Sequence, residues 1–276
     1  MPAYIRLLTA HGLVPAPYTA ESLADAVQHE PVDGVYTVTN TFQRTRVLKI
    51  DAHLNRMEDS AKRAGVALKL DRPRLRAALR QMIEESGFGD VRFRVTVSQA
   101  DPETFILTLE PFQPLPSTVF DRGVRVITAP NSARHNPLAK TTDWMHERTR
   151  LQDAMPPGIY DTILLDEGGA LLEGLSANFY AIMDGALYTA AEGVLPGIAQ
   201  QIVFEVAPGI LPVICEALTV DDLPRIDEAF ITSSSRGIVP VVEIDGRALS
   251  GGIPGAFTLR LRAAYLDWMA VHLEEL

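Results

Sequence analysis

Three groups of residues in this chain could together carry out amine and carbonyl chemistry. Lys140 is the only lysine after Lys69, in a stretch whose other basic residues are arginines. Glu173 lies between an apolar run and a glycine, where a buried carboxylate would need a cationic partner. Residues 195–198 form a glycine-containing turn ahead of a helical pattern, and such a turn presents backbone N–H groups. An amine, a carboxylate and an anion-binding turn are therefore the candidate groups.

These are the groups with which a protein holds and tunes pyridoxal phosphate. A lysine forms a Schiff base with the aldehyde, a carboxylate keeps the pyridine nitrogen protonated, and N–H groups bind the phosphate. Taken alone, Lys140 would be interpreted as a solvated surface charge, because most lysines are exposed. The order of the surrounding motifs favours the cofactor interpretation.

The motifs from about Asp33 onward resemble the class IV, or fold type IV, pyridoxal phosphate enzymes. That family includes branched-chain aminotransferases, D-amino-acid aminotransferases and aminodeoxychorismate lyases. Each short match is weak by itself, but the matches follow one another in the family's order. They are Asp33-Gly34-Val35-Tyr36, His53-Leu54-Asn55-Arg56, Lys140, residues 173–179, residues 195–198 and Thr232-Ser233-Ser234-Ser235.

The resemblance implies pyridoxal 5'-phosphate as cofactor, with Lys140 and Glu173 as the catalytic residues. Ala199 stands where the family usually has a threonine, so one phosphate-binding hydroxyl is missing, and Ser233 and Ser234 could replace it. For His53, helix packing and ligand binding both stay open. The implied cofactor-binding set is Arg56, Lys140, Glu173, Asn178, Leu195, Gly197, Ile198, Ala199, Ser233 and Ser234.

The implied activity is transfer of an amino group between a branched-chain L- or D-amino acid and a 2-oxo acid through a Schiff base on Lys140. A pyruvate-releasing enzyme of the aminodeoxychorismate lyase type is an alternative, because residues 135–139 resemble that branch. A non-catalytic protein that binds pyridoxal phosphate is a third possibility. Such a protein would not need both Lys140 and Glu173.

The residues that select the substrate are less well defined. Arg92 and Arg94 match neither the D-amino-acid nor the branched-chain pattern, and strand alternation places both on one face. That face is interpreted as facing solvent, although Arg94 could reach a substrate carboxylate. The candidate substrate-binding set is Tyr36, Arg94, Arg134, Ser235 and Arg236, and no metal ligands are identified.

The elements around these residues predict a two-domain chain that combines α+β and α/β structure. Strand patterns at residues 36–40, 91–97 and 105–109 and helical patterns at 51–65 and 73–86 predict a smaller α+β domain over residues 1–112. Asp51 is the expected N-cap of the first helix. The proline-rich residues 113–123 are the expected linker, followed by a larger cofactor-binding domain over residues 124–276. The resemblance implies that this domain has a β-barrel-like core flanked by helices.

Composition limits the partners of this protein. With 276 residues, 47% of them hydrophobic, the chain can bury two modest cores. A net charge of −10 without a basic run argues against nucleic acids and anionic membranes as partners. The resemblance implies a small amino acid and a 2-oxo acid as partners. The N-terminal residues show no signal or membrane-spanning pattern, so a cytoplasmic protein is expected. A homodimer is also expected.

Overall fold

The computed structural model describes residues 2–276, which fall into two compact units. The first unit contains the chain up to Gln113 together with Ala139–Glu147 and His272–Leu276, and the second contains Pro114–Leu138 and Arg148–Val271. The sequence predicts a linker over 113–123 and a continuous domain from residue 124. Instead, the second unit begins at Pro114, and the segment with Lys140 belongs to the first unit because it pairs with a strand there.

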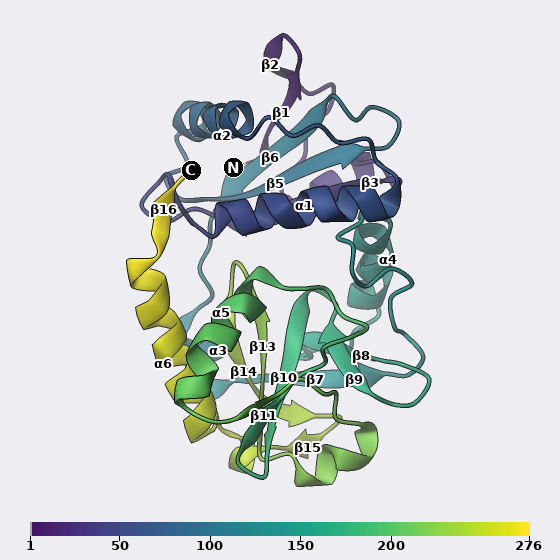
Figure 1. Ribbon diagram of the computed structural model, residues 1–276, viewed down its shortest axis with the longest axis vertical. Helices are drawn as coiled ribbons and strands as arrows, with labels where there is room; N and C mark the ends of the chain where they lie inside the picture. Colours follow the sequence, from purple (N-terminus) through teal and green to yellow (C-terminus); the bar gives the residue numbers. More distant parts are fainter. Residues whose placement is uncertain (1) are drawn as a thin grey trace. The chain divides into compact units, whose positions relative to one another are not determined.

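The first unit is built on an antiparallel five-stranded sheet in the order β2-β1-β6-β5-β3 (Figure 1). Thr141 forms a bridge with Val35, so the Lys140 segment lies along the outer edge of β3. A short pairing of β4 with β16 ties the last residues of the chain to this unit. Its strands are β1 (Tyr4–Thr9), β2 (Gly12–Pro15), β3 (Gly34–Asn40), β4 (Arg46–Leu48), β5 (Val91–Ser98), β6 (Phe105–Pro111) and β16 (Leu273–Glu275).

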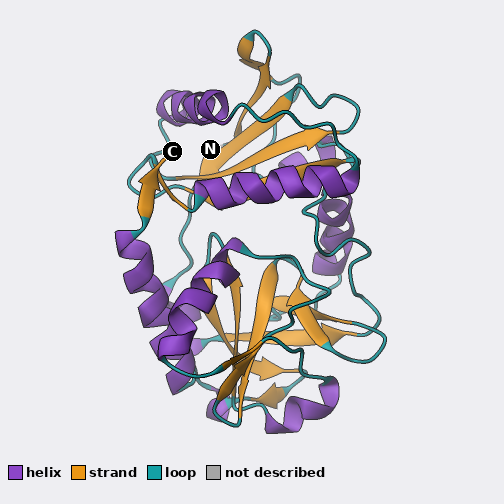
Figure 2. Ribbon diagram, in the orientation of Figure 1, coloured by secondary structure: helices purple, strands orange, loops and turns teal. Residues whose placement is uncertain are grey.

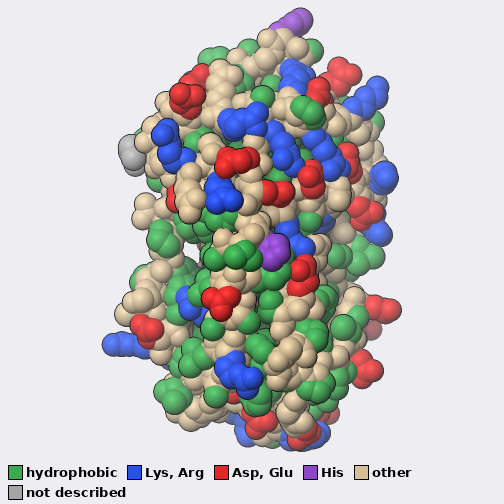
Figure 3. Space-filling model, turned by 60° about the vertical axis from the view of Figure 1, so that its left-hand side comes forward, with side chains coloured by type: hydrophobic (Ala, Val, Ile, Leu, Met, Phe, Trp, Pro, Cys, Tyr) green, Lys and Arg blue, Asp and Glu red, His purple; other side chains and the backbone are tan. Residues whose placement is uncertain are grey.

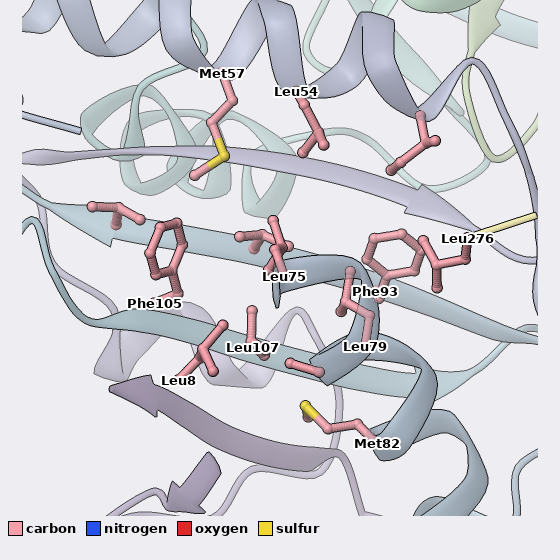
Figure 4. Close-up of a cluster of buried hydrophobic side chains, with 14 of the residues drawn as sticks. Leu8, Leu54, Met57, Leu75, Leu79, Met82, Phe93, Phe105, Leu107 and Leu276 are labelled. Carbon is pink, nitrogen blue, oxygen red and sulfur yellow. The ribbon is translucent and has the colours of Figure 1, made fainter. Parts of the chain in front are cut away.

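Two helices, α1 (Ile50–Ala64) and α2 (Arg72–Ser86), cover one face of this sheet and close a hydrophobic core. Figure 4 shows Leu54 and Met57 of α1 above the strands, with Leu75, Leu79 and Met82 coming from α2. The opposite face carries a smaller apolar cluster, formed by Ile5, Ala20 and Ala26 with Tyr18 and Ile106 at its border. Residues 16–29, which include the short 3-10 helix η1 (Asp25–His29), therefore cover the second face.

The second unit is a closed barrel of six strands in the cyclic order β10-β13-β14-β7-β8-β9 (Figure 2). The β14–β7 and β7–β8 pairs are parallel and the other pairs are antiparallel. Val126, Ile163, Phe179, Ile231 and Val239 belong to its buried core. The barrel strands are β7 (Val124–Ala129), β8 (Asp161–Leu165), β9 (Leu171–Gly174), β10 (Ala177–Met183), β13 (Glu228–Ser233) and β14 (Gly237–Ile244).

Helices α5 (Ile198–Val206) and α6 (Ala256–Val271) pack against each other and against the barrel strands β13 and β14. Asp184 and Gly185 form the turn that joins β10 to β11, and both residues have positive φ, as a tight hairpin turn requires. The remaining elements are α3 (Ser117–Arg122), α4 (Thr142–Asp153), β11 (Ala186–Tyr188), β12 (Val213–Ile214), β15 (Arg247–Ala248), and the 3-10 helices η2 (Ala207–Gly209), η3 (Val220–Arg225) and η4 (Ser250–Gly252).

The expected helices and strands are confirmed, with one correction at the start of α1. The helix begins at Ile50 after Lys49, which has a left-handed backbone conformation, so Asp51 lies in the first turn and is not the N-cap. Within the described residues no helix is long and apolar enough to cross a membrane. Acidic and basic side chains are mixed on the face shown in Figure 3.

Candidate active site

Lys140 is held at the edge of β3 by its own backbone. The Tyr36 N–H donates to the Lys140 carbonyl at 3.0 Å, and the Lys140 N–H donates to Ser60 Oγ at 3.0 Å. The Lys140 Nζ lies 4.5 Å from the centroid of the Tyr36 ring, which is fully buried. The strand edge and α1 thus fix the lysine backbone, while the aromatic ring stabilises the ammonium through a cation–π contact.

One face of α1 is turned toward this lysine segment. His53, Arg56 and Ser60 recur at helical spacing, so they share that face. The His53 Nδ1 pairs with Thr37 Oγ1 at 3.0 Å, and burial together with the charges of Arg56 and Lys140 lowers the pKa of His53 well below its usual range. The imidazole is therefore neutral, and its Nε2 is a buried polar atom with no hydrogen-bond partner among the described residues.

The depressed pKa of His53 makes stability depend on pH in a definite direction. Below about pH 6.5 the unfolded histidine binds a proton that the folded one does not, so the free energy of unfolding falls as the pH falls. We expect the wild-type apoprotein to lose up to about 1.4 kcal/mol per pH unit more than a His53→Gln variant between pH 6.5 and 5. Urea unfolding across this range measures the difference, and parallel curves would contradict it.

In the second unit, Glu173 and Asn178 sit opposite each other on the paired strands β9 and β10 and both hold Leu195. Glu173 Oε2 accepts from the Leu195 N–H at 3.2 Å, and Asn178 Nδ2 donates to the Leu195 carbonyl at 2.8 Å. The other carboxylate oxygen of Glu173 accepts from Arg134 Nη1 at 3.3 Å, and both side chains are buried. Arg134 therefore supplies the cationic partner that a buried Glu173 requires.

The turn that follows Leu195 leads into the N-terminus of α5. Gly197 is the N-cap, and Ile198 and Ala199 form the start of the first turn, where backbone N–H groups lack helical partners. A Cβ on Gly197 would overlap Asn178 Oδ1, so only glycine lets the turn approach that side chain. The helix N-terminus offers a favourable environment for a phosphate.

The serine cluster expected from the sequence lies where β13 turns into β14. Arg236 organises this turn: its Nε donates to Ser233 Oγ at 2.8 Å, and its Nη2 donates to the carbonyl and the hydroxyl of Ser176 at 3.0 and 2.9 Å. Ser233, Ser234 and Ser235 are all half-buried. Arg236 thereby ties this turn to the β9–β10 hairpin that carries Glu173.

Asp161 is a buried residue of this region that the sequence analysis did not single out. Its Oδ1 accepts from the N–H groups of Leu175 and Thr162 at 3.0 and 2.9 Å, and burial raises its pKa. A Cβ on Gly174 would meet the same carboxylate. Asp161 therefore shapes the hairpin just after Glu173, and the available signal was an acidic residue opening the apolar run of β8.

The structure separates the two arginines of β5. Arg94 is 3% exposed and forms a buried ion pair with Glu30, whereas Arg92 is part-exposed and pairs with Glu110 near the surface. The expectation that both face solvent is therefore wrong for Arg94. Alternation does place them on one face, but residues 16–30 cover only part of that face.

Comparison with known proteins adds to this geometry. The family model described as amino-transferase class IV matches residues 34–244, which is most of the chain. The chain belongs to the class IV aminotransferases. A branched-chain-amino-acid aminotransferase of Pseudomonas aeruginosa is 24% identical over 83% of this chain and 80% of that protein. A D-alanine aminotransferase of Bacillus licheniformis is 27% identical over 84% of this chain and 86% of that protein.

The fold of this class IV aminotransferase is that of solved members. A branched-chain amino acid aminotransferase from T.th., solved with pyridoxamine 5'-phosphate, has a TM-score of 0.83 over 98% of both chains at 21% identity. The expected fold type IV, with its barrel and flanking helices, is thus confirmed. The protein is accordingly a pyridoxal-phosphate-dependent transaminase.

The residues present fit such a cofactor. In the first unit, Lys140 has a side-chain amine next to the buried Tyr36 ring, and the unsatisfied Nε2 of buried His53 lies on the helix face that also carries Arg56. In the second unit, the buried Glu173 carboxylate accepts from the Leu195 N–H. Asn178 donates to the Leu195 carbonyl and lies against Gly197, the N-cap of α5. Cationic and N–H groups suit the anionic phosphate of pyridoxal phosphate, and a buried carboxylate suits its basic pyridine nitrogen.

Proposed function

We propose that this aminotransferase carries its cofactor on Lys140 and moves an amino group between a branched-chain amino acid and a 2-oxo acid. The observation that carries the proposal is the fixed Lys140 backbone, with the amine over the Tyr36 ring and within electrostatic range of buried, neutral His53. When bound, pyridoxal phosphate supplies an electron sink for the negative charge that develops at the substrate Cα.

Within the first unit, the Lys140 Nζ would accept the proton that leaves the substrate Cα once the cofactor is bound. On the facing helix, Arg56 is a cation and His53 is neutral. The free amine is the form that accepts a proton. Arg56 would bind the cofactor phosphate through charge-assisted hydrogen bonds.

Within the second unit, Glu173 would pair with the pyridine N–H of the bound cofactor, and Leu195 would pack on its ring. Arg134 and the Leu195 N–H already hold the Glu173 carboxylate, so its orientation is set before the cofactor binds. The N–H groups of Ile198 and Ala199 would hold the phosphate, and Ser233 and Ser234 would supply hydroxyls in place of the missing threonine.

Arg56→Ala is expected to weaken cofactor binding more than it slows the saturated enzyme. A hydrogen bond to a charged group contributes about 1.5–3 kcal/mol, so the Kd for pyridoxal phosphate should rise roughly tenfold to a hundredfold. Titration of the apoprotein measures the Kd directly. Arg63→Ala is the matched control, because Arg63 lies on the same helix and pairs with Asp59 at the surface. Equal affinities of the two variants would remove Arg56 from the phosphate site.

The proposed substrates are small or branched-chain amino acids as donors, with 2-oxoglutarate or pyruvate as acceptor, and L- rather than D-enantiomers. The similarity to branched-chain and D-alanine aminotransferases supports this class of substrate. The side chains of Tyr36 and Val38, which share one face of β3, would form an apolar wall that suits such substrates. Paired half-reactions with L- and D-leucine, L- and D-alanine, and L- and D-glutamate test it through loss of the cofactor's visible absorbance. If no donor acts while aminodeoxychorismate yields pyruvate, the lyase alternative is correct.

We also propose that the enzyme is a cytoplasmic homodimer. Large apolar side chains are exposed on or next to α6, including Leu259, Leu266 and Ile253, and such a surface suits an interface between two copies. Light scattering on the purified protein measures the mass. A monomer at micromolar concentration would rule the dimer out.

A further inference from the structure

Arg236 connects three parts of the second unit through one guanidinium group. Its Nε donates to Ser233 Oγ at 2.8 Å, and its Nη2 donates to the carbonyl and hydroxyl oxygens of Ser176 at 3.0 and 2.9 Å. Its Nη1 lies 3.9 Å from Oδ2 of the buried Asp161. The guanidinium carbon also lies over the Tyr160 ring, 5.7 Å from its centroid. These contacts fix both the position and the plane of the group.

The charge of Arg236 is directed into the protein. Two of its nitrogens donate to serine oxygens, and the third faces the Asp161 carboxylate, which balances the charge. Asp161 is itself held in place by the N–H groups of Thr162 and Leu175. The Arg236 side chain is only 20% exposed. We therefore look for its effect in the neighbouring residues that it contacts.

The neighbour whose chemistry changes most is Ser233. A guanidinium can only donate hydrogen bonds, so Ser233 Oγ must be the acceptor in this pair. The Ser233 hydroxyl makes no other hydrogen bond to the residues that the structure describes, which leaves its proton available to a ligand. Accepting from a cation also makes a hydroxyl a stronger donor. The Arg236 N–H donates to the Ser233 carbonyl at 3.2 Å, so the backbone of the turn is fixed as well.

The turn that carries Ser233 lies close to the N-terminus of α5. Thr232, which precedes Ser233, is directly opposite Asn178 in the pairing of β13 with β10. The Asn178 side chain in turn lies against Gly197, the N-cap of α5. Asn178 is therefore next to both elements that are proposed to bind the cofactor phosphate.

We propose that Arg236 is a positioning residue, which holds the Ser233 hydroxyl as a hydrogen-bond donor to the cofactor phosphate. Because Ala199 provides no hydroxyl at the start of α5, this donor carries a larger share of phosphate binding. The inference rests on the proposed function, since it assumes that the phosphate binds at the N-terminus of α5.

Affinities of the apoprotein for pyridoxal phosphate and for pyridoxal, which lacks the phosphate, test the role of Arg236. The Kd for pyridoxal divided by the Kd for pyridoxal phosphate isolates the contribution of the phosphate. Ser233→Ala and Arg236→Met should each lower this ratio about tenfold or more, the effect of one hydrogen bond to a charged group. Because Arg236 acts through Ser233, the double variant should lower it no further than either single variant.

Two further arginine variants separate positioning from charge and from general damage. Arg236→Lys keeps a cation beside Asp161 but loses the planar set of donors, so the ratio should fall here too. Arg247→Met is the matched control, because Arg247 is an exposed arginine of the same unit that donates to the Pro224 carbonyl. It should leave the ratio unchanged. Thermal melts report whether each variant folds, and Ser233→Ala and Arg236→Lys give the result if Arg236→Met does not fold.

The outcomes distinguish this inference from the proposed function. A wild-type ratio in folded Ser233→Ala or Arg236→Lys would overturn the positioning role, as would losses that multiply in the double variant. Equal affinity of the wild-type protein for the two compounds would instead overturn the proposed phosphate site.

Discussion

Replacing Lys140 with alanine is expected to abolish turnover while the protein stays folded. The lysine is both the attachment point of the cofactor and the group that moves the substrate proton, so the rate should fall by about 10⁴-fold or more. Folding should be little affected, because the segment is held by backbone contacts to Tyr36 and Ser60 that alanine retains. Single-turnover assays and the visible absorbance of the cofactor measure the loss.

Lys69→Ala is the control for this experiment, since Lys69 is an exposed lysine of the same unit. It should match wild type in cofactor absorbance and rate. If the Lys140→Ala variant kept both the absorbance of lysine-bound cofactor and measurable turnover, another amine would have to carry the chemistry.

Glu173→Gln is expected to retain cofactor but to slow the chemical step about 10²–10³-fold. A neutral amide cannot keep the pyridine nitrogen protonated, and the loss of one preorganised electrostatic contact is of this size. The substitution also leaves Arg134 without its charged partner inside the unit, so the melting temperature should fall as well.

Half-reaction rates and cofactor content, measured on the same preparation, separate the two effects of Glu173→Gln. Glu167→Gln, at an exposed position in the turn before β9, serves as the control and should leave both quantities unchanged. A Glu173→Gln enzyme with a lower melting temperature and a near-normal half-reaction would show that the carboxylate is structural only.

The local features of this protein could be predicted from the sequence because they depend on residues close together in the chain. Apolar periodicity predicted α1 and α2 to within one or two residues, and alternation predicted β5 and β6. The short motifs around Lys140, Glu173 and Gly197 identified the family that the comparisons show. The choice of Asp51 as N-cap was wrong because the left-handed Lys49, which pattern alone does not indicate, starts the helix earlier.

The partners of the charged residues were decided only by tertiary structure. Glu30 and Arg94 are 64 residues apart in sequence, and Arg134 and Glu173 are 39 apart, so no local pattern joins them. Strand alternation showed that Arg92 and Arg94 share a face, but not that residues 16–30 bury one and leave the other near solvent. The placement of Lys140 in the first unit likewise depends on pairing with β3, a contact that forms only when distant segments fold together.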